Sequence, residues 1–308
     1  MKPRLVIIAG PTGVGKSAAA LALAGEFGGE IVNADSMQVY RFMDIGTAKP
    51  SPEDRARIRH HLIDVVAPDE EYNAALYAEQ ARRVIQTLHE GGRNVWVAGG
   101  TGLYIRALTG GLVEGPGRDE GMRSIFRQEI ERYGTAYLHD RLKEKDRAAA
   151  GKIHPNDAVR LMRALEVFEL SGESIVTRQA GHHFSDQPYN CLKIGLTDDR
   201  DRLNERMDRR CDEMVEAGLI EEVEGLLARG YSESLKSMQS IGYRHVAAYL
   251  KGVLSLGEAV ARMKRDTRAY AKRQLTWFRA DGEMNWIRPG EAERMRKRIV
   301  SFLCPAGD

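Results

Sequence analysis

The N-terminal third of the chain alternates short apolar runs with longer amphipathic segments. Short runs of branched or aromatic apolar residues predict buried strands at Leu5–Ala9, Glu30–Asn33 and Asn94–Ala98. Between them, apolar residues at helical spacing predict helices over Ser17–Phe27 and from about Tyr77 to Glu90. Strands and helices that alternate in this way are typical of a parallel sheet with helices on both faces.

The pattern changes at the glycine-rich segment Gly110–Gly117, which reads GGLVEGPG. A charged region with helical character follows, from Asp119 to about Gly172. Strand character returns at Cys191–Leu196, and long helices are predicted over Arg202–Arg229 and Ser255–Phe278. The middle of the chain therefore predicts a helical module inserted into an α/β domain.

The length of the chain suits this division. A chain of 308 residues can form a main domain that carries a smaller insertion. We therefore predict a core domain made of residues 1–117 and 190–308, interrupted by an all-helical domain at 118–189. The second part of the core supplies the last predicted strand and the C-terminal helices.

The composition is that of a soluble folded protein, with 43% hydrophobic and 29% charged residues. The apolar run near the N-terminus is too short to span a bilayer and leads into a glycine loop, so we expect neither membrane association nor export. Cys191, Cys211 and Cys304 form no C-x-x-C pair, which argues against a disulfide framework or a zinc site. We expect a monomer in a reducing cytoplasm.

The strongest chemical signal is the segment Gly10–Ser17, GPTGVGKS, which fits the phosphate-loop pattern G-x-x-x-x-G-K-S. It lies between a predicted strand and a predicted helix, as this motif requires. Its glycines let backbone N–H groups point at phosphate oxygens, Lys16 adds a positive charge, and Ser17 can ligand Mg²⁺ at the helix N-terminus. The fold class that follows is a P-loop NTPase-like parallel sheet flanked by helices.

The loop does not reveal which diphosphate it holds, because different diphosphates present the same anion to the same donors. An ordinary P-loop ATPase places an acidic residue after a neighbouring strand to hold Mg²⁺ and position water. Here Val95–Ala98 runs into Gly99–Gly102 without a carboxylate. This argues against a motor or switch NTPase, whereas a small-molecule kinase that binds ATP remains an alternative.

Two side chains follow the predicted strands at the edge where ligands of such sheets bind. Asp35 comes just after the second strand and suits a general base, although a turn or cap aspartate explains the same position. Thr101 lies in the glycine-rich loop after the third strand, where it either orients a substrate or caps the next helix.

Seven segments of the chain, in this order, resemble the tRNA dimethylallyltransferase family. The resemblance extends from Gly10 to Arg279, and the DSMQVYR-x-MDIGTAKP block is far more diagnostic than the phosphate loop. The segments are GPTGVGKS, NADSMQVYRFMDIGTAKP, HHLID, VAGGTGLY, IHPNDAVRLMRALEVF, SIGYRH and AKRQLTWFR.

This resemblance implies alkyl transfer, with dimethylallyl diphosphate and Mg²⁺ in the phosphate loop and adenine 37, beside the tRNA anticodon, entering the opposite end of a channel. It implies that Asp35 is the general base for the N6 amine, that Thr101 orients this amine and that Arg210 adds a cation to the diphosphate. Arg206 and Arg209 remain alternatives to Arg210. The residues implied to hold the diphosphate are Thr12, Gly13, Val14, Gly15, Lys16 and Ser17, the last also as the Mg²⁺ ligand.

The resemblance also implies an RNA-binding surface. The target adenine must leave its stack to be alkylated, so contacts to a single-stranded loop are expected, with the helical insertion gripping the anticodon stem-loop. Without the resemblance, Arg160 and Arg163 fit exposed arginines of an amphipathic helix capped by Asn156 or Asp157. The implied tRNA contacts are Asp35, Ser36, Met37, Gln38, Thr101, Arg123, Val159, Arg160, Leu161, Met162, Arg163, Ser240, Ile241, Gly242, Tyr243, Arg244 and His245.

The net charge of only +2 does not indicate a general polyanion binder. Seven basic residues nevertheless lie between Arg262 and Arg279, with Asp266 as the one acid. This stretch could either contact tRNA phosphates or form an ordinary solvated helix surface, and the sequence favours neither interpretation. On a helix, one face would carry Arg265, Arg268, Lys272 and Arg279, and another would carry Met263, Thr267, Tyr270, Gln274 and Trp277.

Overall fold

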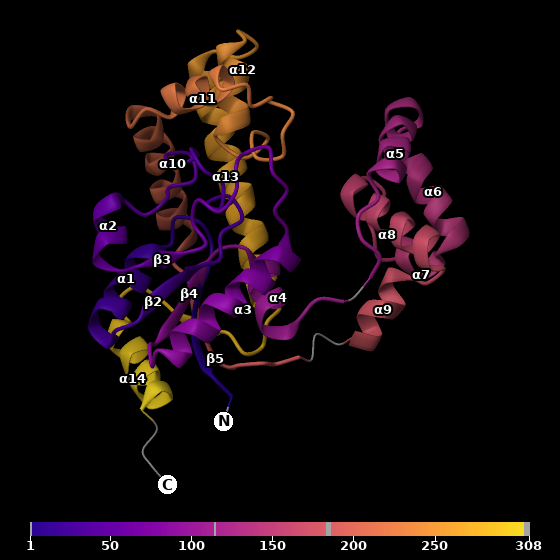
Figure 1. The fold of residues 1–308 in the computed structure, drawn as a ribbon. Coiled ribbons are helices and arrows are strands. Elements are labelled where there is room, and N and C mark those ends of the chain that lie inside the picture. The colour runs from indigo at the N-terminus through magenta and orange to yellow at the C-terminus, as the bar shows by residue number, and fades with distance from the viewer. Residues whose placement is uncertain (1, 114, 183–185, 305–308) are drawn as a thin grey trace. The chain divides into compact units, whose positions relative to one another are not determined.

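The computed structural model describes residues 2–113, 115–182 and 186–304, and it divides into two compact units. The first unit contains the chain up to Thr109 and again from Pro188, and the second contains Gly110–Gln187 (Figure 1). The sequence pattern placed the corresponding boundaries at 118 and 189. None of the helices in the described part of the chain combines the length and the apolar character that a bilayer crossing requires.

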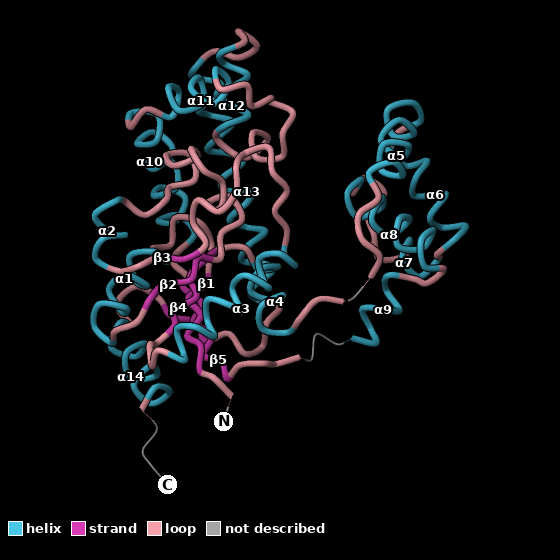
Figure 2. The backbone as a smooth tube through the Cα atoms, in the orientation of Figure 1, coloured by secondary structure: helices cyan, strands magenta, loops and turns pink. Residues whose placement is uncertain are grey.

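The first unit is built on a six-stranded sheet in the order β3-β2-β4-β1-β5-β6, and all of its pairings are parallel. Figure 2 shows its strands gathered between helices. This confirms the predicted α/β class. The two shortest strands, β3 and β6, were not predicted, because two or three residues carry no readable periodicity. The strands are β1 (Arg4–Ala9), β2 (Glu30–Asn33), β3 (His60–His61), β4 (Val95–Gly99), β5 (Asn190–Leu196) and β6 (Asn285–Ile287).

The core of this unit follows from strands that are buried on both faces. In β1, Val6 and Ile8 belong to an apolar cluster that includes Leu23 of helix α1 (Lys16–Phe27). Leu5 and Ile7 alternate with them, therefore point to the opposite face of the sheet, and are fully buried as well. A continuous apolar run is what a central parallel strand requires.

Helices of the first unit begin and end at recognisable signals. The side chain of Asn73 caps α3 by accepting the N–H groups of Ala75 and Leu76, so this helix begins before the predicted Tyr77. The predicted helix Arg202–Arg229 is in fact two helices, because Gly218 at φ 101° interrupts it. The helices are α1 (Lys16–Phe27), α2 (Pro52–Arg57), α3 (Ala74–Glu90), α4 (Gly102–Gly110), α10 (Arg200–Glu216), α11 (Leu219–Ala228), α12 (Tyr243–Leu250), α13 (Leu256–Arg279) and α14 (Ala292–Leu303).

The described residues of the second unit fold as a helical bundle. Phe126, Leu138, Leu142, Leu161 and Leu165 form its apolar core, each with at most 1% of its surface exposed. The pattern that predicted helices from Asp119 onward reflects this core, since every helix contributes apolar residues to a shared centre. The helices are α5 (Glu120–Tyr133), α6 (Thr135–Lys145), α7 (Arg147–Ala150), α8 (Ala158–Ser171) and α9 (Ile175–His182).

Candidate active site

The glycine loop Gly10–Ser17 connects β1 to α1 at the carboxyl edge of the sheet. Gly10 has φ 147°, and a Cβ there would lie 2.5 Å from the carbonyl oxygen of Leu196. Gly13 and Gly15 have φ values of 76° and 96°, a region that favours glycine. The loop thus curls tightly beside β5, in the geometry that directs backbone N–H groups at an anion.

Lys16 is partly buried at the end of this loop. Its Nζ donates a hydrogen bond of 2.7 Å to the carbonyl oxygen of Pro11. Burial lowers the pKa of Lys16 to about 8, the carboxylate of Asp35 opposes that change, and the guanidinium of Arg210 adds to it. The lysine therefore shares its electrostatic environment with both the candidate base and the candidate diphosphate cation.

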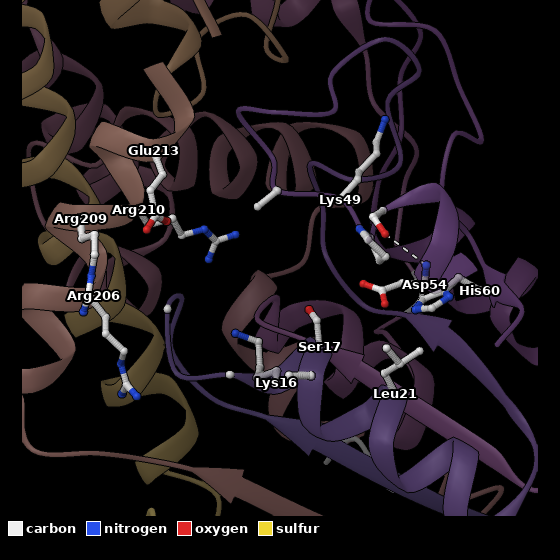
Figure 3. Close-up of a pocket in the computed structure, with 16 residues that line it drawn as sticks. Lys16, Ser17, Leu21, Lys49, Asp54, His60, Arg206, Arg209, Arg210 and Glu213 are labelled. Carbon is white, nitrogen blue, oxygen red and sulfur yellow. Dashed lines mark hydrogen bonds between the residues drawn. The ribbon is translucent and has the colours of Figure 1, made fainter. Parts of the chain in front are cut away.

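A cavity of about 790 Å³ opens beside the loop. Figure 3 shows Lys16 and Ser17 at the start of α1, Arg210 extending from α10, and Asp54 and His60 on the far side. A volume of this size is typical of a small-molecule site. Cationic and hydroxyl groups therefore line a space that can take a diphosphate with a short hydrocarbon group.

Arg210 is the α10 arginine that reaches the phosphate loop. Its Nη1 donates to Thr12 Oγ1 at 3.5 Å, a long hydrogen bond. Burial lowers the pKa of Arg210, and the carboxylate of Asp35 opposes this. Arg206 and Arg209 also line the cavity, but Arg206 forms an ion pair with Asp198.

Lys49 lines the same cavity, although sequence reasoning did not single it out. Its Nζ pairs with Asp44 at 2.6 Å and with Asp64 at 2.5 Å, and only 1% of the side chain is exposed. Figure 3 shows it directed away from Lys16. Lys49 therefore neutralises these two carboxylates and holds the loop after β2, rather than offering a charge to a ligand.

Asp35 follows β2, and its side chain stabilises a turn, as expected of a turn or cap aspartate. Its Oδ1 accepts N–H groups of Met37 at 2.8 Å and of Gln38 at 3.4 Å. The other carboxylate oxygen forms no hydrogen bond within the described residues. Turn formation therefore leaves one oxygen of Asp35 to accept a proton.

Thr101 joins the loop after β4 to the loop after β2. Its Oγ1 accepts the N–H of Ser36 at 2.9 Å and donates to Ser36 Oγ at 3.2 Å, while the Thr101 N–H donates to the Ala34 carbonyl oxygen at 3.1 Å. The preceding Gly99 has no room for a side chain, since a Cβ would lie 2.1 Å from the same oxygen of Ala34. Thr101 is thus held next to the segment that begins at Asp35.

Glu222 of α11 fixes the segment further along, a role with no local signal in the sequence. Its carboxylate accepts the N–H groups of Asp44, Ile45 and Gly46 at 2.8, 2.8 and 3.1 Å. The buried Tyr243 hydroxyl donates to the same carboxylate at 2.5 Å. One acidic side chain therefore anchors a loop that lies far from it in the sequence.

Several implied tRNA contacts of the first unit are internal in this structure. Gln38 is 8% exposed and donates to the carbonyl oxygens of Thr47 and Ala48. Tyr243 is fully buried and His245 is 5% exposed. Ser240, Ile241 and Arg244 are partly exposed, whereas Gly242 is buried. Arg244 pairs with Asp266 at 2.6 Å.

The implied contacts of the second unit divide in the same way. Arg123 and Arg163 both bind the fully buried carboxylate of Glu166, at 2.7 and 2.6 Å. Val159 is 70% exposed and the Arg160 side chain 68% exposed, so these two lie on the surface. Leu161 is buried in the core and Met162 packs against it. Asp157 caps α8 through the N–H of Arg160, as the amphipathic alternative predicted.

The basic stretch of α13 has the two faces that helical spacing predicted. Met263 and Gln274 are buried, and Thr267, Tyr270 and Trp277 are partly buried. On the other face, Arg268 pairs with Asp208 at 2.6 Å and Arg265 with Asp266 at 3.1 Å. Lys272 and Arg279 are exposed, and neither forms an ion pair within the described part of the chain. Part of the stretch is thus neutralised internally.

A family model described as IPP transferase matches residues 38–281. The chain belongs to the IPP transferase family. This confirms the resemblance drawn from its motifs. The chain is 54% identical over 302 residues to "tRNA dimethylallyltransferase 2" of Syntrophus aciditrophicus, covering 98% of this chain and 97% of the relative. It is 51% identical to "tRNA dimethylallyltransferase" of Geobacter metallireducens, covering 98% of each.

Solved structures of IPP transferase relatives have the same fold. The tRNA isopentenylpyrophosphate transferase of Bacillus halodurans superposes with a TM-score of 0.72 at 41% identity, covering 98% of this chain and 96% of that one. A eukaryotic dimethylallyltransferase solved acting on tRNA gives a TM-score of 0.80 at 27% identity, covering 97% and 78%. Fold and sequence therefore agree on the family.

Proposed function

We propose that this chain transfers a dimethylallyl group from dimethylallyl diphosphate to N6 of adenine 37 in tRNA, giving N6-dimethylallyladenosine and diphosphate. The main structural support is that burial lowers the pKa of both Lys16 and Arg210 and the Asp35 carboxylate opposes this fall. Asp35 does not line the cavity itself, but its effect on both cations supports a base close to the site that would bind the diphosphate. The curated relatives that carry the name tRNA dimethylallyltransferase support this substrate pair.

In the proposed reaction the bond from the allylic carbon to the diphosphate oxygen breaks as the N6–carbon bond forms. Negative charge grows on the departing diphosphate, so donors preorganised around it lower the barrier. Gly13, Val14 and Gly15 present backbone N–H groups, and Lys16 and Arg210 supply positive charge. Thr12 contributes its hydroxyl, because its own N–H already bonds Gln274. These groups act on the leaving group alone.

At the other end of the reaction, the N6 amine must lose a proton as it becomes bonded to carbon. Asp35 accepts this proton through the oxygen that its turn leaves available. Thr101 lies beside Ser36 on the same loop system and orients the amine toward the allylic carbon. Protonated Asp35 then returns the proton to water after product leaves.

Magnesium fits this site as a partner of the substrate rather than of a preformed protein cluster. The described residues contain no group of three or more histidine, cysteine or acidic side chains able to hold a metal. Mg²⁺ commonly takes one or two protein ligands and completes its shell with substrate phosphates and water. The Ser17 hydroxyl, at the N-terminus of α1 and on the cavity wall, is the ligand this chain would offer. When bound, the ion neutralises charge on the diphosphate.

For tRNA, we propose that the helical unit grips the anticodon stem-loop through exposed residues such as Val159 and Arg160. The target loop is contacted by the Asp35–Gln38 segment and by residues 240–245. Because the side chains of Gln38, Tyr243 and His245 are buried, these three must move to contact RNA. Arg123 and Arg163 are implied RNA contacts, but both form salt bridges with Glu166. These salt bridges favour a role in stabilising the helical unit. We further propose that the enzyme works as a cytoplasmic monomer.

The deciding experiment incubates unmodified tRNA with the protein, Mg²⁺ and dimethylallyl diphosphate, then analyses the nucleosides by mass spectrometry. We expect a five-carbon addition on adenosine that requires both the allylic diphosphate and the RNA. Consumption of ATP without RNA would instead support a P-loop kinase of a small metabolite. Binding of tRNA without any modified nucleoside would leave only an RNA-binding protein.

A further inference from the structure

Gln274 joins two loops that supply different parts of the site. This glutamine of α13 is 5% exposed. Its Oε1 accepts the N–H of Thr12 in the phosphate loop at 2.8 Å, and its Nε2 donates to the carbonyl oxygen of Gly100, next to Thr101, at 2.9 Å. Both polar ends of the buried amide are therefore used, each on a different loop.

The two loops are shaped to fit this face of α13. A Cβ on Gly100 would lie 2.2 Å from Gln274 Nε2, and a Cβ on Gly102 would lie 2.1 Å from the Trp277 ring. Contacts shorter than 3 Å of this kind require the neighbouring atoms to move. The absence of side chains at Gly100 and Gly102 thus allows the helix to approach the backbone on both sides of Thr101.

Tyr270, one turn before Gln274 on the same face, completes the connection. Burial raises the pKa of its hydroxyl, the Asp35 carboxylate raises it further, and the neighbouring Thr101 and Gln274 side chains partly oppose these effects. The phenol therefore lies against both the threonine and the glutamine, with the candidate base within electrostatic range. One helix face contacts the phosphate loop, Thr101 and the surroundings of Asp35.

We infer that Gln274 is a positioning residue that fixes the phosphate loop relative to the Thr101 loop, and that Tyr270 supports it. This inference rests on the proposed function. Alkyl transfer requires the leaving group and the attacking amine to be held in line, and a misplacement of about 1 Å can cost a hundredfold in rate. Gln274 contacts the backbone N–H and carbonyl groups directly, so it sets this spacing without contacting either substrate.

The principal test is Gln274→Met, which keeps the length of the side chain but removes both hydrogen bonds. We expect kcat to fall on the order of a hundredfold, with much smaller changes in the KM for tRNA and for dimethylallyl diphosphate. Gln86→Met is the matched control, because Gln86 is an exposed glutamine of α3 that bonds only Glu90 among the described residues. The control is expected to keep wild-type kcat.

A double-mutant cycle separates positioning from general stabilisation. If Gln274 aligns the Thr101 loop, adding Thr101→Val to Gln274→Met costs much less than Thr101→Val costs in the wild type. Independent effects on kcat, which multiply in the double variant, would overturn the inference. So would a wild-type kcat for Gln274→Met, even with a lowered Tm, because that result indicates a purely structural residue.

Tyr270→Phe keeps the inference testable if Gln274→Met does not fold. It deletes one hydroxyl and leaves the glutamine in place, so we expect a several-fold lower kcat, an unchanged Tm and coupling to Thr101→Val. A wild-type kcat for this variant would then refute the positioning role of this helix face. If wild-type protein itself forms no prenylated adenosine, the proposed function fails instead, so the two failures are distinguishable.

Discussion

Lys16 and Asp35 lie on loops that follow different strands, yet the charge of one acts on the other. Burial lowers the pKa of Lys16 to about 8, and the Asp35 carboxylate limits this fall. The lysine is therefore positively charged at neutral pH but loses its charge at a pH far below the ordinary lysine value of 10.5. The electrostatic attraction of Lys16 for a bound anion therefore changes with pH near 8.

We predict that the affinity of the free enzyme for inorganic diphosphate decreases as the pH rises through 8. The folded-state pKa of Lys16 is depressed, so the lysine is protonated below this pH. Above it, the protonated fraction falls by about tenfold per pH unit. Isothermal titration calorimetry on both sides of pH 8 measures the effect. Lys16→Arg, whose guanidinium stays protonated, should not show this decrease. Titration of diphosphate itself is common to both proteins, so identical profiles would contradict the prediction.

Lys16→Ala and Asp35→Ala should each lower turnover by about a hundredfold or more, because each removes charge at one end of the reaction. The tRNA affinity should change much less. Single-turnover prenylation and filter binding measure the two quantities separately. Asp69→Ala, at an exposed acid outside the cavity lining, serves as the control. Wild-type turnover in either site variant would refute the role of that residue.

The salt dependence of tRNA binding should identify which arginines and lysines of α13 meet phosphate. Binding should weaken steeply with salt, and replacing both Lys272 and Arg279 by alanine should reduce the slope by about one for each residue. Arg265 and Arg268 already pair with acids, so their replacement should change the slope less. An exposed lysine of α14, Lys297, is the control. A flat salt profile for the wild type would favour a merely solvated surface.

Glu166 should be essential to the stability of the helical unit. Its burial would raise the pKa, but hydrogen bonds from Arg123, Arg163 and the Asp119 N–H outweigh this and lower it to about 2. Glu166→Ala leaves two arginines without this partner, so we expect a loss on the order of 3 kcal/mol in the free energy of unfolding. Urea unfolding of the full chain measures it, with exposed Glu144→Ala as control.

The same carboxylate predicts how this loss depends on pH. A depressed folded-state pKa contributes stability that is complete above the unfolded value of about 4.5 and is lost as the pH falls toward 2. The difference in unfolding free energy between wild type and Glu166→Ala should therefore narrow across that window. A difference that stays constant down to the acid limit would show that the ion pairs contribute little.

The parts of the site that lie in contiguous motifs were predictable from the sequence. The phosphate loop and the carboxyl-edge positions of Asp35 and Thr101 follow from short patterns next to buried strands. The alternation of strands and helices in the sequence predicted a parallel sheet, and the six-stranded sheet confirms it. Local patterns succeed here because the physics that they reflect, burial and backbone turning, is itself local.

Partners that come from distant segments were not predictable. Arg268 belongs to a basic stretch, but its pairing with Asp208 joins residues 60 positions apart. Gln274 bonds Thr12 across 262 positions, with nothing in its own neighbourhood to mark that contact. A single sequence reports which side chains are charged or apolar, whereas these contacts depend on how the helices pack.

The position of β1 in the sheet has a consequence for biosynthesis. One of its neighbours, β4, is made before the helical unit, but the other, β5, follows only after the entire helical unit. A ribosome needs on the order of ten seconds to cover that stretch, and during this time one side of β1 has no native strand to pair with. Because Gly10 packs against Leu196 at the end of β5, and Arg210 and Gln274 come later still, the anion cradle is completed only late in translation.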